Sequence, residues 1–170
     1  LWDHLMDCGA PHGMEFSSTH ALTIRRIEGG ILGNGTDITP DMTPFEAGLA
    51  PFVNMDKGDF IGRTALLTKE RHCCLFGVTC STKTPAAGAL IFDGGREVGR
   101  ITAGIPSPTL GLGVGYVHFN TRGDWVGRTL AMRLPDGSLH DAQIVQPPFF
   151  DPDKKIVRGL DRSIPQRPAN

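Results

Sequence analysis

Four short runs between residues 26 and 66 decide the fold class: Arg26-Ile27-Glu28-Gly29-Gly30, Asp37-Ile38, Thr43-Pro44-Phe45-Glu46-Ala47-Gly48-Leu49 and Asp59-Phe60-Ile61-Gly62-Arg63-Thr64-Ala65-Leu66. They predict a helix with a cationic end, a loop broken by glycine and two further helix starts. Thr43 and Glu46 have the spacing of a capping box, with Pro44 at the first helical position. Asp59 is expected to cap a helix that continues to about Arg71. This part of the chain is therefore predicted to combine helices with loops.

Two helices and a short strand are expected in the first thirty residues or so. The first helix has Trp2, Leu5 and Met6 on one apolar face. Residues 13–16 are predicted to form the strand. One of the three hydroxyl residues at 17–19 can cap the second helix, which ends before the paired glycines.

After Cys73 the sequence changes to short apolar runs separated by turn residues. Six strands are predicted, over residues 74–80, 89–92, 99–103, 113–118, 129–134 and 139–146. Hairpin turn chemistry stands at 93–95 and 135–137. Such spacing, with almost no helical periodicity, favours a small antiparallel barrel or sandwich. The predicted fold class is α+β, with one domain over residues 1–71, a β domain over residues 72–150 and a tail over residues 151–170.

The composition argues against several classes of protein. The chain has 170 residues, with 17 Lys+Arg against 18 Asp+Glu and a formal net charge of -1. No basic excess indicates a nucleic-acid partner, and no apolar run approaches the ~20 residues that a membrane-spanning helix needs. The four cysteines lack the spacing of a zinc site and predict reduced thiols. We therefore expect a cytoplasmic protein without nucleic-acid or membrane partners.

Most motifs that could carry chemistry do not fit their context. The glycines at 111, 113 and 115 lead into a predicted strand, whereas a dinucleotide-binding loop opens a helix. The six histidines are scattered, and none pairs at metal-ligand spacing on one helix. No metal site is predicted, and no self-sufficient catalytic set is found.

Arg25 and Arg26 are the exception. Adjacent helical residues point about 100° apart, so one arginine can face solvent while the other turns inward. An inward arginine can clamp a ligand carboxylate through two hydrogen bonds. Alternatively, both cations complement the helix dipole, with a surface pair to Glu28. The residues alone leave both interpretations open.

A resemblance to a known family rests on the same runs. In their order, the four runs between residues 26 and 66 are similar to the glycine-cleavage T-protein family, which comprises folate-dependent aminomethyltransferases and their relatives. The C-terminal part resembles the barrel of that family in Gly99-Arg100-Ile101-Thr102-Ala103-Gly104, Ser107-Pro108-Thr109-Leu110-Gly111, Gly115-Tyr116-Val117 and Pro148-Phe149-Phe150-Asp151-Pro152. The resemblance covers nearly the whole chain. It implies the end of a mixed α/β folate-binding region followed by a small antiparallel β-barrel.

The resemblance also implies site residues. Arg26 falls on the arginine that contacts folate or substrate in the family. Lys154 or Asp151 lies close to where the family's C-terminal segment reaches back towards the site. Asn34 sits about where T-proteins often carry an aromatic residue that lines the pocket, and this departure argues against a strict glycine-cleavage T-protein. The family's catalytic aspartate and a pterin-contacting glutamate are expected upstream of Leu1, so no catalytic residue is assigned.

The main hypothesis is a C-terminal fragment of a tetrahydrofolate-dependent one-carbon transferase. Its expected partners are tetrahydrofolate, a small methylated or aminomethyl donor and the missing N-terminal half of the same protein. Transfer from a small molecule is preferred to glycine cleavage itself. The alternatives are a non-catalytic folate-binding or scaffolding module and the folate domain of a larger amine dehydrogenase. On the main hypothesis, the isolated chain is inactive.

Overall fold

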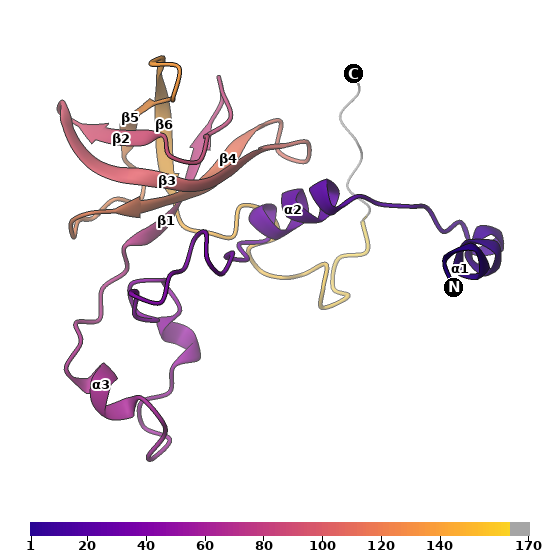
Figure 1. The fold of residues 1–170 in the computed structure, drawn as a ribbon, viewed down its shortest axis with the longest axis horizontal. Helices are drawn as coiled ribbons and strands as arrows, with labels where there is room; N and C mark the ends of the chain where they lie inside the picture. The colour runs from indigo at the N-terminus through magenta and orange to yellow at the C-terminus, as the bar shows by residue number, and fades with distance from the viewer. Residues whose placement is uncertain (164–170) are drawn as a thin grey trace.

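The C-terminal part of the chain closes into a six-stranded barrel (Figure 1). The structure, a computed structural model, describes residues 1–163. The strands are β1 (Leu75–Cys80), β2 (Leu90–Asp93), β3 (Arg96–Ser107), β4 (Leu112–Phe119), β5 (Thr129–Arg133) and β6 (Leu139–Val145). Each pairs antiparallel with both neighbours, in the order β1-β4-β3-β2-β5-β6. The six predicted strands are confirmed, and they form the barrel rather than the sandwich.

Helical elements precede the barrel: α1 (Trp2–Gly9), η1 (Ala10–His12), α2 (Thr19–Glu28), η2 (Ala50–Phe52) and α3 (Arg63–Leu67). The Ser18 side chain caps α2, because it accepts a hydrogen bond from the backbone N–H of Ala21 at 3.2 Å. The helix stops at Gly29 and Gly30, and Gly30 takes a φ of +75°. The predicted start and end of α2 are thus confirmed. This helix packs on β3 and β4, whereas α1 lies apart at the end of an extended segment (Figure 1).

Apolar side chains form two clusters, one inside the barrel and one between the barrel wall and α2. β4 contributes to both, because its residues alternate between the two faces of the wall. Val114 and Tyr116 belong to the α2 cluster, and Val117 and Phe119 belong to the interior cluster. The Trp125 ring stacks on Phe119 with 4.2 Å between ring centroids. Burial on both faces explains why β4 is an almost continuous apolar run.

β3 changes the face on which its side chains lie. Ile101 pairs with Val117 and Ala103 pairs with Tyr116, so Thr102 is the extra residue of a β-bulge. Ile101 belongs to the interior cluster, whereas Ala103 packs against the α2 cluster. In a regular strand, residues 101 and 103 would share one face. The bulge therefore turns the second half of β3 towards α2.

The structure departs from the predicted elements at residues 13–16 and 59–71. Residues 13–16 form no strand and instead link η1 to α2 as irregular chain. The helix expected from Asp59 to about Arg71 covers only Arg63–Leu67. Its N-cap is Gly62 rather than Asp59, because the chain turns there through a left-handed conformation with a φ of +91°.

The predicted capping box forms, but it starts only a single turn. The N–H of Thr43 donates to the Glu46 carboxylate at 2.7 Å, and the N–H of Glu46 donates to the Thr43 hydroxyl at 3.2 Å. The turn then ends at Gly48, which has a φ of +73°. Pro51 follows three residues later and cannot continue a helix. The expectation of a full helix is therefore wrong, although its start was predicted correctly.

The segment that follows β6 returns to the end of α2. The backbone N–H groups of Phe149 and Phe150 donate to the carbonyl oxygen of Glu28, at 3.0 and 2.9 Å. The Phe149 ring also packs against Tyr116, with 5.8 Å between ring centroids. These contacts attach the start of the C-terminal segment to α2. The predicted tail over residues 151–170 lies in the description as far as residue 163, and its last seven residues fall outside it.

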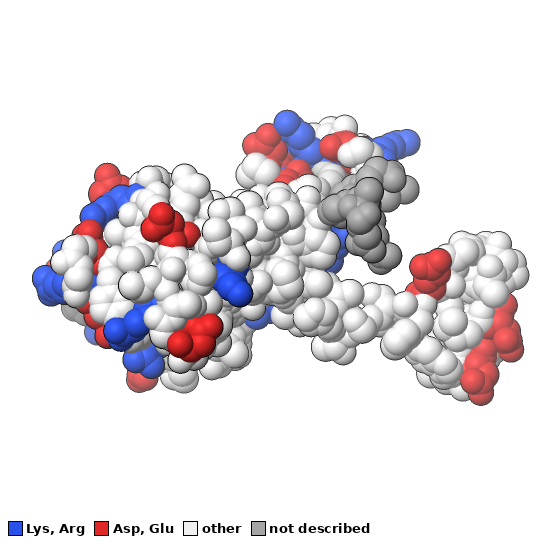
Figure 2. Space-filling view, turned by 90° about the horizontal axis from the view of Figure 1, so that it is seen from above, with Lys and Arg blue, Asp and Glu red and all other residues white. Residues whose placement is uncertain are grey.

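Charges of both signs are spread over the barrel on the face seen in Figure 2. On the same face, the separate lobe that contains α1 shows acidic side chains. Within residues 1–163, no helix has the length and apolar character needed to cross a membrane. The surface thus mixes both signs of charge around the barrel.

Lowering the pH is expected to weaken the turn that Thr43 and Glu46 form. Hydrogen bonds from the backbone N–H and the hydroxyl of Thr43 hold the pKa of Glu46 below its ordinary value of 4.5. A carboxyl with a lowered folded-state pKa stabilises the fold above its unfolded pKa, and this contribution is lost as the pH falls through the folded value.

Urea unfolding of the wild type and of Glu46→Gln, from about pH 7 to about pH 3, measures this effect. The difference between their free energies of unfolding should shrink towards the acid end. A difference that stays constant over the whole range would contradict a role for the Glu46 charge.

Candidate functional site

The end of α2 carries two arginines in different surroundings. The Arg25 side chain is 59% exposed, and the Arg26 side chain is 25% exposed. One faces solvent and the other turns inward, as the helical geometry predicts. Each arginine pairs with a different buried carboxylate: Arg25 with Glu28 and Arg26 with Asp37.

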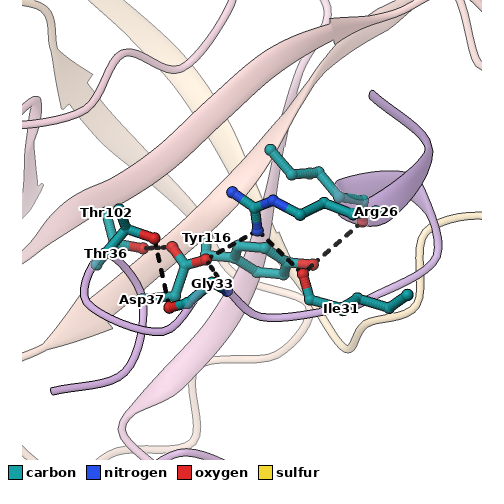
Figure 3. A network of polar contacts seen from close by, with 8 residues as sticks. Arg26, Ile31, Gly33, Thr36, Asp37, Thr102 and Tyr116 are labelled. Carbon is teal, nitrogen blue, oxygen red and sulfur yellow. Dashed lines mark hydrogen bonds and ion pairs between the residues drawn. The ribbon is translucent and has the colours of Figure 1, made fainter. Parts of the chain in front are cut away.

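Asp37 is the centre of the first polar network (Figure 3). Its side chain is 0% exposed. Oδ2 lies 3.1 Å from Nη1 of Arg26 and accepts the backbone N–H of Gly33 at 2.7 Å. Oδ1 accepts the hydroxyl of Thr102 at 2.6 Å. A buried carboxylate needs such partners, and here they come from α2, from the loop that follows it and from the barrel.

Tyr116 of β4 belongs to the same network and contacts the backbone at the end of α2. Its hydroxyl donates to the carbonyl oxygens of Ile27 and Ile31, at 3.2 and 3.3 Å. Burial, and then the neighbouring charge of Asp37, raises the pKa of Tyr116 well above its usual range. The phenol therefore stays protonated and remains a donor. Nη1 of Arg26 also donates to the Ile31 carbonyl, at 3.0 Å, so that carbonyl is bound from two sides.

Glu28 is the centre of the second network and is 1% exposed. The hydroxyl of Ser107 donates to Oε1 at 2.5 Å, and the hydroxyl of Thr109 donates to Oε2 at 3.2 Å. Nη1 of Arg25 lies 2.9 Å from Oε2 and also donates to the Thr109 hydroxyl at 2.9 Å. An arginine pair with Glu28 thus forms, as one interpretation expected. It is not a surface pair, however, because the carboxylate is buried, and the arginine is Arg25.

A cavity of about 270 Å³ lies between the end of α2 and the C-terminal segment. The carbonyl of Gly29 accepts a hydrogen bond from Nζ of Lys154 at 3.1 Å, which draws the segment to the helix. The cavity therefore combines apolar walls with two cations and two carboxylates. Its lining comprises Arg25, Glu28, Gly29, Phe150, Asp151, Lys154, Ile156 and Val157.

The three predicted site residues do not converge on one point. Lys154 lines the cavity, whereas Arg26 is not among the lining residues and pairs with Asp37. Asn34 is exposed in the turn over residues 33–38, where its backbone forms a bridge with Ile38. The cation that lines the cavity beside Lys154 is Arg25 rather than the predicted Arg26. A role for Arg26, Asn34 and Lys154 in ligand binding remains a prediction.

Residue types alone did not identify Asp37 and Thr102 as partners of Arg26. A signal was nevertheless present, because both residues stand within runs that carry the family resemblance, Asp37-Ile38 and Gly99 to Gly104. Glu28, Ser107 and Thr109 likewise belong to such runs. The runs that carry the family resemblance therefore supply the side chains that join α2 to the barrel.

The arrangement around Arg26 suits an anionic ligand. Nη1 makes the contacts of Arg26, and within residues 1–163 neither Nε nor Nη2 makes a hydrogen bond to the protein. These nitrogens can bind a carboxylate while Nη1 stays on Asp37. In the same residues no three His, Cys, Asp or Glu side chains gather in a way that could hold a metal ion.

Two family models match the chain, in sequence order. The model described as the GCVT N-terminal domain matches residues 1–57. The model described as the glycine cleavage T-protein C-terminal barrel domain matches residues 71–151. The first match contains the Arg26–Asp37 pair, and the second contains Thr102 and the barrel strands.

Curated relatives named aminomethyltransferase are similar to the chain. Identity is 31% over 156 residues for the protein of Saccharopolyspora erythraea and 35% over 158 residues for that of Halothermothrix orenii. Both matches cover 88% of this chain, but only 42% and 43% of the relatives. The crystal structure of the glycine cleavage system aminomethyltransferase T from Bartonella henselae matches with a TM-score of 0.71 and 28% identity, over 81% of this chain and 40% of that one. The chain thus spans less than half the length of these relatives.

Replacing Asp37 by asparagine is expected to destabilise the fold by about 3 kcal/mol, the lower end of the range for breaking a buried ion pair. The amide loses the charge opposite Arg26, and its NH2 group would face the N–H of Gly33 or the hydroxyl of Thr102. Chemical unfolding measures the change. Asp41→Asn, an exposed position in the same loop, serves as the control and should change stability by less than about 0.5 kcal/mol. Equal effects of the two substitutions would contradict the central place of Asp37.

Proposed function

Since the chain belongs to the glycine-cleavage T-protein family, we propose that it forms the C-terminal part of a tetrahydrofolate-dependent one-carbon transferase. Both family models match in order, and the barrel has the fold of an aminomethyltransferase structure. The observation that carries the proposal is Arg26, which is held by Asp37 through one nitrogen and keeps other donors for a ligand. The rest of the site, including its catalytic groups, would come from the remainder of the larger protein.

The residues present fit the chemistry of tetrahydrofolate. Its glutamate tail carries carboxylates, for which a partly buried arginine is a suitable partner. Arg26 would bind a carboxylate through Nε and Nη2, and the ammonium group of Lys154 keeps two donors beyond its bond to the Gly29 carbonyl. Asn34 would offer its amide from the exposed turn that follows α2.

Tetrahydrofolate supplies the nitrogen that accepts the one-carbon unit. The part played by this chain is positioning: its cations bind the folate and fix its orientation, which is how a bound co-substrate is brought close to its donor. No proton transfer is assigned to any residue of this chain. The four cysteines are free thiols, which supports a cytoplasmic location for the enzyme.

The donor proposed is a small methylated or aminomethyl compound. The relatives are named for aminomethyl transfer. Asn34, where T-proteins often carry an aromatic residue, supports a donor other than that of glycine cleavage. A non-catalytic folate-binding module is the second candidate, because the cations Arg25 and Arg26 are each held by a buried carboxylate, an arrangement that serves binding.

Replacing Arg26 by alanine in the intact protein expressed from its gene is expected to weaken tetrahydrofolate binding by about 1.5–3 kcal/mol, the scale of a hydrogen bond to a charged group. Titration calorimetry measures the affinity, and a thermal melt of the same sample checks that the variant is folded. Arg100→Ala removes an exposed arginine from β3 and should leave the affinity unchanged. An Arg26→Ala protein that binds as tightly as the wild type would remove this residue from the site.

Turnover assays of the same intact protein test the reaction. We expect one-carbon transfer to tetrahydrofolate from a small methylated amine to be faster than transfer from the aminomethyl-lipoyl carrier protein of glycine cleavage. Equal rates would contradict the donor preference. Folate binding without turnover from any donor would favour the non-catalytic module. Turnover by the isolated 170-residue chain would contradict the proposal that catalytic groups lie elsewhere.

A further inference from the structure

We propose that Thr102, a residue of the barrel, positions Arg26 for its ligand through the carboxylate of Asp37. This inference rests on the proposed function, since it assigns Arg26 to the folate site. The connection is direct: the Thr102 hydroxyl donates to Oδ1 of Asp37 at 2.6 Å, and Oδ2 of the same carboxylate lies 3.1 Å from Nη1 of Arg26 (Figure 3). The barrel would thus control the binding residue without contacting the ligand.

The Thr102 hydroxyl determines how the Asp37 carboxylate is oriented. A carboxylate can rotate about its last bond, so its two oxygens are interchangeable until their partners differ. Here Oδ1 has the Thr102 hydroxyl, and Oδ2 has the N–H of Gly33 together with Arg26. Removing the hydroxyl would leave Oδ1 buried without this donor, and the carboxylate would turn or draw in another donor. Either change moves the oxygen that holds Arg26.

The β-bulge explains why Thr102 can reach Asp37 although the two residues are 65 positions apart in sequence. Thr102 is the extra residue between two paired positions of β3, and bulges commonly redirect a side chain at such a point. The next residue, Ala103, also packs on the α2 side of the wall. Thr102 therefore lies at the position where the strand turns from the barrel core towards the helix.

Arg25 has the same kind of support. Its carboxylate partner Glu28 accepts the hydroxyls of Ser107 and Thr109, which follow from the second half of the same strand and the turn after it. Each arginine of the pair is thus linked through one buried carboxylate to hydroxyls of the barrel. Two parallel connections of this kind define where both cations stand relative to β3. A single Arg–Asp contact would not do so.

A double-mutant cycle in the intact protein tests the inference, with tetrahydrofolate as the probe and calorimetry as the readout. Thr102→Val removes the hydroxyl and keeps the shape of the side chain, and it should weaken tetrahydrofolate binding about tenfold. Thr102→Ser keeps the hydroxyl and should bind within about twofold of the wild type. In the Arg26→Ala background, Thr102→Val should have no further effect, because the residue that it positions is gone. Thr129→Val, the same change at an exposed position of β5, is the control.

The outcomes separate this inference from the proposed function. If Arg26→Ala weakens binding but Thr102→Val does not, or if the two effects simply add, the positioning role of Thr102 is overturned and the folate contact stands. If Arg26→Ala leaves the affinity unchanged, the folate contact itself is overturned, and the inference with it. A thermal melt of each variant sets the titration temperature well below unfolding, so that a loss of stability is not read as a loss of affinity.

Discussion

The buried carboxylate of Asp37 is the interaction on which the rest of this structure depends. It is fully buried, and a charge in that position is tolerated only when its oxygens are paired. Its partners come from three segments: Arg26 at the end of α2, Gly33 in the loop that follows and Thr102 in the barrel. Satisfying one side chain therefore fixes the helix end, the loop and the barrel relative to one another. Glu28, the last residue of α2, repeats the arrangement with Arg25 and Ser107.

Because of this constraint, the barrel determines where the end of α2 lies. Its strands carry no predicted catalytic residue, yet β3 and β4 supply Thr102 and Tyr116 to the end of α2, where the two arginines stand. The two family models divide the chain in the same way, because the N-terminal match contains Arg26 and Asp37 and the barrel match contains Thr102 and Tyr116. In our proposal the α2 end is one wall of a folate site, and the barrel holds that wall in place.

Sequence patterns predicted the helices and strands well and the side-chain contacts between them poorly. Six strands and the limits of α2 follow from apolar runs, turn residues and caps, which act over a few positions. The turn at Thr43 shows the limit of this approach, because the capping box formed but Gly48 ended the helix after one turn. The partner of Arg26 could not be derived from spacing. The orientation of the Asp37 carboxylate depends on a hydrogen bond from Thr102, and the position of Thr102 depends on a bulge in the pairing of β3 with β4. Only the family resemblance pointed to those residues, and it did so without giving their contacts.

A crystal structure of the intact protein with tetrahydrofolate bound would show whether Arg26 binds the folate while Asp37 holds it in place. We expect a carboxylate of the folate within hydrogen-bonding distance of Nε or Nη2 of Arg26, with Nη1 still on Asp37 and Thr102 still on the other carboxylate oxygen. A folate bound out of reach of Arg26, or an Arg26 that leaves Asp37 to bind it, would contradict the role that we propose for this network.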